Sequence, residues 1–174
     1  MKALKLIGKC LFLSLSMLAL SCSSDDDGGG GGSTPDGTYI KAKVDGTQYV
    51  TYSISGFSAG VATSSGSGSG RLIMITGSND MNGDTAFSIN LLGINSTGTY
   101  EIGPDSDSTL AFVLTGGSGV SYDTSNCAGA TGTINITTLS ATEVKGTFSF
   151  TGKDDENCTD SKSVTAGSFR GVFM

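Results

Sequence analysis

Hydrophobic and polar residues alternate with a period of two along most of the chain beyond its first 37 residues. Ile40, Ala42 and Val44, for example, alternate with Lys41 and Lys43. This period is typical of strands with one face in a core and the other in water, because successive side chains point to opposite sides. Further runs of the same kind are Val50–Ile54, Phe87–Leu91, Leu110–Leu114, Ile134–Ile136 and Val144–Phe150.

No stretch of the chain combines a helical apolar stripe with capping residues. Gly, Asn and Asp interrupt the alternating runs, as turn residues do. The pattern therefore predicts an all-β domain over residues 38–174. We expect an antiparallel β-sandwich or flattened barrel of roughly nine or ten strands.

Two dipeptides predict tight hairpin turns. Asp45-Gly46 directly follows the first alternating run, and Asn82-Gly83 lies between two later runs. Both pairs suit the type I′ turn, which needs a positive φ at its two central residues.

A third hairpin is predicted near the C-terminus. Gly132–Leu139 and Val144–Phe150 read as two strands joined by a short turn. Facing residues of an antiparallel pair have a constant sum of positions, and we expect Ile134 opposite Phe150.

Cys127 and Cys158 are the only cysteines after Cys22. In that expected register they lie almost opposite each other, just beyond the open end of the hairpin. Facing residues are close enough for a disulfide, and exported chains meet an oxidising compartment. The sequence predicts a structural disulfide, with two free buried thiols as the alternative.

Residues 1–21 have the order of a secretory signal. Three lysines and no acid precede an apolar run from Cys10 to Leu20. That run is too short to span a bilayer, which needs roughly 20 apolar residues. The segment Leu18-Ala19-Leu20-Ser21-Cys22 resembles a lipobox, although Ala19 stands where lipoboxes usually have Leu. The resemblance implies cleavage before Cys22 and lipid on its thiol. An uncleaved anchor helix is the alternative.

Residues 22–37 then comprise the lipidated cysteine and a flexible acidic, glycine-rich tether without apolar residues. Ser24, Asp25, Asp26 and Asp27 resemble the export signal of Bacteroidetes-type surface lipoproteins. The resemblance implies display on the outer face of the outer membrane. A plain spacer on a periplasm-facing anchor is the alternative.

Net charge narrows the range of partners. Loss of residues 1–21 removes three lysines and no acids, which leaves 7 Lys and Arg against 16 Asp and Glu, or 7 − 16 = −9. So acidic a chain repels phosphate backbones and anionic lipid. We expect no nucleic-acid partner and a membrane contact through the lipid anchor.

The chain contains no histidine. This excludes Ser-His-Asp and Cys-His mechanisms and His-ligated zinc sites. Glu101, Glu143 and Asp105 are candidate glycosidase carboxylates, but turn or strand-end roles are favoured. We therefore expect no enzymatic activity, no catalytic residue and no cofactor.

Three segments are rich in oxygen ligands. Asp80, Asn82 and Asp84 have the spacing of an EF-hand loop, but Thr85 and Leu91 occupy positions that need Gly and Glu. The others are residues 105–107 and 154–160. Solvated acidic loops are favoured over a weak calcium site, so no metal site is predicted.

Two further features concern sugars. Asp84-Thr85-Ala86 and Asp107-Ser108-Thr109 resemble the O-glycosylation sites of Bacteroidetes proteins, which implies Thr85 and Ser108 as modified residues. Ordinary turn and strand-start sequence is the alternative.

The chain lacks tryptophan, and its tyrosines are favoured for packing over sugar stacking. These are Tyr39, Tyr49, Tyr52, Tyr100 and Tyr122.

The order of several short motifs resembles a family of small Bacteroidetes surface lipoproteins with a conserved all-β domain of unknown function. The motifs are Lys43-Val44-Asp45-Gly46, Gly98-Thr99-Tyr100, Gly132-Thr133-Ile134-Asn135-Ile136, Gly146-Thr147-Phe148-Ser149-Phe150 and Gly167-Ser168-Phe169. The resemblance implies location and fold class, but no activity. Our hypothesis is a surface-displayed, non-enzymatic binding or structural lipoprotein with a glycan or protein ligand. A glycan-active hydrolase or carbohydrate-binding accessory protein is the alternative.

Overall fold

The computed structural model describes residues 36–114 and 119–174. These residues form thirteen strands and one short 3-10 turn, η1 (Gly68–Gly70), without an α-helix, which confirms the predicted all-β class. A helix long and apolar enough to cross a membrane is accordingly not found in this part of the chain. The strands are β1 (Tyr39–Val44), β2 (Thr47–Val50), β3 (Ser53–Ile54), β4 (Phe57–Ser58), β5 (Gly60–Ser65), β6 (Leu72–Ser78), β7 (Thr85–Leu92), β8 (Gly98–Ile102), β9 (Thr109–Leu114), β10 (Val120–Asp123), β11 (Thr131–Leu139), β12 (Glu143–Asp154) and β13 (Ser161–Val172).

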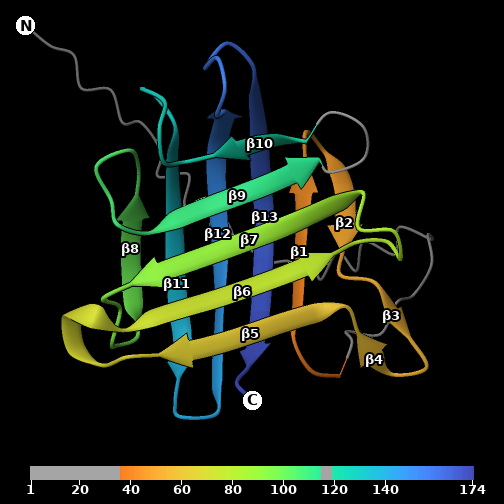
Figure 1. Ribbon diagram of the computed structural model, residues 1–174, viewed down its shortest axis with the longest axis vertical. Coiled ribbons are helices and arrows are strands. Elements are labelled where there is room, and N and C mark those ends of the chain that lie inside the picture. Colours follow the sequence, from red (N-terminus) through yellow and green to blue (C-terminus); the bar gives the residue numbers. More distant parts are fainter. Residues whose placement is uncertain (1–35, 115–118) are drawn as a thin grey trace, which may run out of the picture. The chain divides into compact units, whose positions relative to one another are not determined.

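Eleven of these strands form one antiparallel sheet, and β3 and β4 form a separate hairpin. The sheet follows the order β2-β1-β13-β12-β10-β9-β7-β6-β5, and β11 joins β12 to β8. The sheet curls into a half-barrel of two layers: β5, β6, β7 and β9 cross over β8, β11, β12, β13 and β1 (Figure 1). Strand β10 connects the layers because it pairs with both β9 and β12. This curled antiparallel sheet confirms the predicted architecture, a sandwich or flattened barrel.

The core lies between the two layers and is built from the alternating runs. Ile40, Ala42 and Val44 of β1 all point inward, as the period of two predicts. Each fully buried aliphatic or aromatic side chain contributes about 1.5–3 kcal/mol, so the alternation is the main source of stability. The other large side chains with less than 2 % exposure are Ile73, Ile75, Ile89, Leu91, Leu110, Phe112, Ile134, Ile136, Val144, Val164 and Phe169.

Aromatic rings join the layers at the centre of this core. Phe87 and Phe112 of one layer have ring centroids 5.2 Å apart, and Phe148 of the other layer lies 6.1 Å from Phe87. Tyr49 packs edge-on against Phe112 at 5.3 Å. Tilted and edge-to-face arrangements such as these are the favoured ones for aromatic pairs.

The first predicted turn is confirmed. Asp45 and Gly46 connect β1 to β2 with φ of 48° and 87°, as a type I′ turn requires. Asn82 and Gly83 lie in the β6–β7 hairpin loop, as predicted, but this loop is longer than a two-residue turn. It is closed by a hydrogen bond from the amide of Asn79 to the carbonyl of Thr85 at 3.1 Å.

The alternating run Val50–Ile54 does not form one strand. Strand β2 ends at Val50, and the next residue, Thr51, is buried. Its hydroxyl accepts a hydrogen bond from the amide of Ile40 at 2.8 Å and donates one to the carbonyl of Ile40 at 3.0 Å. The amide of Thr51 also donates to the carbonyl of Ile40 at 2.9 Å. The hydroxyl therefore serves as the acceptor for the Ile40 amide, and the regular strand pairing ends at this point.

The register of the β11–β12 hairpin differs from the prediction by two residues. Ile134 faces Phe148, and Phe150 faces Gly132. A bulge between Ile136 and Thr138 shifts the pairing near the turn, and a bulge of this kind leaves no clear mark in an alternating pattern.

Candidate functional site

Part of the predicted site lies outside the described residues. This holds for the cleavage and lipidation site at Cys22 and for the export signal Ser24, Asp25, Asp26 and Asp27. These assignments stay predictions.

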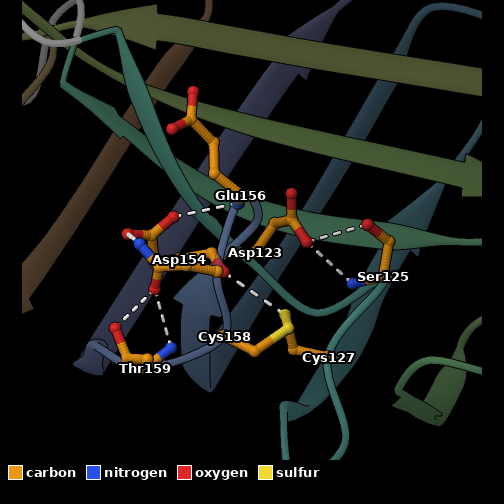
Figure 2. The surroundings of a disulfide bond; sticks show 8 residues. Asp123, Ser125, Cys127, Asp154, Glu156, Cys158 and Thr159 are labelled. Carbon is orange, nitrogen blue, oxygen red and sulfur yellow. Dashed lines mark hydrogen bonds between the residues drawn. A yellow bond between two sulfur atoms is a disulfide. The ribbon is translucent and has the colours of Figure 1, made fainter.

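The predicted disulfide between Cys127 and Cys158 is present, with Cα atoms 5.5 Å apart (Figure 2). The route to it differs from the expected one. The pairing of β12 with β11 ends where Thr151 faces Thr131, and the last residues of β12 pair with β10. Cys158 lies in the turn after β12 and has a φ of 60°. The bond therefore joins two loops at one end of the sheet and does not extend the hairpin ladder.

Two buried carboxylates flank this disulfide. Asp123 accepts hydrogen bonds from the amide and hydroxyl of Ser125 at 2.9 and 2.8 Å (Figure 2). Asp154 accepts from the amide of Glu156 and the side-chain amide of Asn157, both at 2.9 Å. Each carboxylate thus holds its own loop in shape, which accounts for its burial without a ligand.

The β6–β7 loop is organised in the same way. Asp80 accepts hydrogen bonds from the amide of Asp84 at 2.9 Å and from that of Thr85 at 3.2 Å. The bond from Asp84 is the main cause that lowers the pKa of the Asp80 carboxyl below 3.8. Among residues 36–114 and 119–174, no three His, Cys, Asp or Glu side chains gather in a way that could hold a metal ion.

The structure separates Glu143 from the other two candidate catalytic carboxylates. Glu143 pairs with Lys145 at 2.9 Å and Arg170 at 3.1 Å, and these cations, Lys145 foremost, lower its pKa below 4.5. Glu101 and Asp105 line one shallow hollow next to β8 that does not include Glu143. Glu101 also accepts a hydrogen bond from the hydroxyl of a β11 threonine.

The outer side of β8, β11, β12 and β13 presents an array rich in hydroxyl and amide groups, and we call these groups the hydroxyl face. Its side chains are exposed or half-buried and lie in register across the four strands, because they occupy the alternate positions of each core-facing run. Two shallow hollows lie over it, and both include Thr133 and Ser149. The hydroxyl face comprises Thr99, Thr131, Thr133, Asn135, Thr147, Ser149, Thr151, Ser163, Thr165 and Ser168.

A second surface feature has the opposite character. The β3–β4 hairpin and the β6–β7 loop form the sides of an open hollow lined by Ile54, Phe57 and Met81. These three side chains are 56, 78 and 75 % exposed. We call them the apolar tip. The sequence pattern did not reveal it, because two-residue strands are too short for a period to be read.

The two candidate glycosylation sites differ in accessibility. Ser108 is 4 % exposed, and its hydroxyl accepts a hydrogen bond from the amide of Leu92 at 3.0 Å. Thr85 is half-buried at the start of β7. Its hydroxyl donates a hydrogen bond to the carboxylate of Asp80 at 3.4 Å. Modification of either residue stays a prediction, and Thr85 is the more accessible of the two.

The tyrosines mostly pack, as expected. Tyr122 is buried, and Tyr49 and Tyr100 pack against the core. Tyr52 lines the hollow beside the apolar tip, whereas Tyr39 is half-buried at the start of β1. The structure thus gathers no row of exposed tyrosine rings in the residues that it describes.

Comparison with curated proteins gave no match, and comparison with solved structures gave none either. Residues 37–173 match the profile of a protein family described as "Domain of unknown function (DUF6252)". Since this match covers the whole described sheet and most of the chain, the protein belongs to the DUF6252 family.

Proposed function

We propose that the protein is a Bacteroidetes-type lipoprotein, cleaved before Cys22 and anchored in the outer membrane by lipid on that cysteine. The order of three lysines, a short apolar run and a cysteine supports the anchor. The acids Asp25, Asp26 and Asp27 support display on the outer face, because they follow the anchored residue after only two serines, as in surface lipoproteins.

For the β-domain itself we propose non-enzymatic binding of a neutral glycan. The observation that carries the proposal is the hydroxyl face, which spans four strands and contains ten hydroxyl or amide side chains. Hydroxyl groups both donate and accept hydrogen bonds, so this array can match the hydroxyl groups of a sugar polymer without requiring a charge on it. The lack of histidine and the separation of Glu143 from Glu101 and Asp105 favour binding over catalysis.

A screen of the mature protein against glycans and host proteins tests this proposal. We expect a neutral glycan among the ligands, and we expect Thr147→Lys with Ser149→Lys to abolish its binding, because the long charged side chains cover the array. Thr76→Lys with Ser88→Lys, a register pair on β6 and β7 of the other layer, is the matched control. Binding that survives the first pair of changes, or that both pairs abolish equally, would contradict the proposal.

Glycan hydrolysis is a second candidate, and one observation favours it: Glu101 and Asp105 line the same hollow. Paired carboxylates are the minimum set for a glycosidase. Release of reducing sugar from the glycan found in the screen, lost in both Glu101→Gln and Asp105→Asn, would establish this candidate. No release by the unmodified protein would dismiss it.

A further inference from the structure

The apolar tip is the most exposed apolar feature of the domain. Only four large hydrophobic residues in the described part of the chain are more than half exposed, and three of them form the tip. The fourth is Met174 at the C-terminus. Large apolar side chains that gather on a surface usually mark a site of contact with a partner or a membrane.

The tip has a defined shape. Ile54 faces Phe57 across the β3–β4 hairpin, whose turn residues Ser55 and Gly56 have φ of 50° and 84°. Facing residues of a hairpin point to the same side, so both side chains project together. The hairpin is tied to the neighbouring β6–β7 loop, which carries Met81, by a hydrogen bond from the amide of Tyr52 to the carbonyl of Ser78 at 2.7 Å.

The tip also lies where the chain from Cys22 enters the domain. The hydroxyl of Ser58, beside Phe57, donates a hydrogen bond to the carbonyl of Thr38, one residue before β1 begins. Gly60 packs so closely on Thr38 that a Cβ atom there would overlap its carbonyl oxygen. The hairpin and the entry point of the chain are therefore fixed against each other.

Few residues separate this entry point from the cysteine of the proposed anchor. Fourteen peptide units separate Cys22 from Asp36, and a glycine-rich chain of that length has a mean end-to-end distance of about 20 Å. With lipid on Cys22, a tether of this size would keep the tip close to the bilayer at a high local concentration, so that even weak insertion would be effective.

We propose that Ile54, Phe57 and Met81 insert into the lipid bilayer and give the domain a second contact with the membrane beside its anchor. The inference rests on the proposed lipidation of Cys22. The contact is apolar in origin: the mature chain has a net charge of 7 − 16 = −9, which repels anionic lipid. Exposed apolar and aromatic side chains suit the boundary between headgroups and acyl chains.

The absence of tryptophan from the chain makes the insertion measurable. Phe57→Trp places a single fluorophore in the tip. Leu92→Trp is the matched control, because Leu92 is a partly exposed apolar residue at the end of β7 remote from the β6–β7 loop. Both variants, in the mature lipidated form, are reconstituted into phosphatidylcholine vesicles with and without bromine on the acyl chains.

We expect bromine to quench the emission of Phe57→Trp and to leave that of Leu92→Trp unchanged. Adding Ile54→Ser and Met81→Ser to Phe57→Trp should remove the quenching, while the protein still floats with the vesicles. Flotation with equal quenching of the two tryptophans, or with none, would overturn the insertion and leave the anchor intact. Failure to float would overturn the anchor and the insertion together.

Discussion

Gly146 is buried near the start of β12, and the ring of Phe169 occupies the space where a side chain would lie. A Cβ atom there would clash with the carbonyl oxygen of Asn135 and lie 2.9 Å from the ring of Phe169. We expect Gly146→Ala to lower the free energy of unfolding by about 1–3 kcal/mol, as overpacking does. Urea denaturation measures it. Gly70→Ala, which meets nothing within 4 Å, is the control, and equal losses in both variants would refute this view of the packing.

Cys22 is the residue on which the proposed anchor depends. We expect Cys22→Ser to abolish fatty-acid labelling and to leave an uncleaved precursor, because the serine hydroxyl cannot replace the thiol as the lipid acceptor. Metabolic labelling and intact mass report both effects. The lipoprotein proposal fails if the variant is labelled as strongly as the unmodified chain.

Single residues also mark the limit of what the sequence could predict. The inward positions of Ile40 and Ile134 follow directly from the period of two. The role of Thr51 could not be predicted, since its two side-chain hydrogen bonds to Ile40 join residues that are eleven positions apart. The exposure of Phe57 was equally hidden, because an isolated apolar residue is normally expected inside.

Among the elements, the loops at the end of β10 and β12 depend on the disulfide. The bond between Cys127 and Cys158 spans 31 residues, and closing a loop of that size contributes roughly 3–4 kcal/mol in the chain-entropy treatment. We expect Cys127→Ala with Cys158→Ala to lose stability of that order in denaturant. A thiol assay on the denatured, unreduced mature protein should find no free thiol, and two reactive thiols would contradict the bond.

The β1–β2 turn and β13 are held together by an ion pair with a defined pH dependence. Lys162 lies 2.9 Å from Asp45, and its hydrogen bond is the main cause that lowers the pKa of the Asp45 carboxyl below 3.8. Because the pKa is lower in the folded than in the unfolded protein, the ionised Asp45 carboxylate contributes its full stabilisation above about pH 3.8. This stabilisation is lost as the pH falls through the pKa of the folded state. Both groups are partly exposed, so the effect is small.

We therefore expect Asp45→Asn to lose less thermal stability than the unmodified protein when the pH falls below 3.8, because asparagine keeps the type I′ turn but does not titrate. The midpoint of thermal unfolding, followed by circular dichroism over that pH range, measures the difference. Parallel curves for the two proteins would mean that this ion pair contributes nothing.

At the level of elements, the sequence predicted the β11–β12 hairpin and its disulfide but not their exact geometry. The turn at Ser140 and the runs beside it were sufficient to place the two strands. The register of the hairpin depends on the bulge in β11. The route to Cys158 depends on β10, which pairs with the same edge of β12 as β11 does. Such long-range pairing is decided by the packing of the layers and leaves no local signal.

For the whole molecule, composition and alternation were enough to predict an antiparallel, two-layer β-domain, whereas the order of its strands was not predictable. The hydroxyl face and the apolar tip emerge only from that order. The hydroxyl face needs four strands in register, and the tip needs a hairpin and a loop that are separated by more than twenty residues in the chain. Under the two proposals above, the tip would contact the membrane and the hydroxyl face would be available to a ligand.

The accessibility of the protein on whole cells tests the central claim, display on the outer surface, most directly. External protease is added to intact cells that carry the unmodified chain or the variant Asp25→Ala, Asp26→Ala, Asp27→Ala, and lipid labelling confirms that both are anchored. We predict that the unmodified protein is degraded and that the variant is protected, because it remains on the inner leaflet. Equal degradation of both would mean that the three acids are only part of a spacer and not an export signal. Protection of the unmodified protein would contradict surface display.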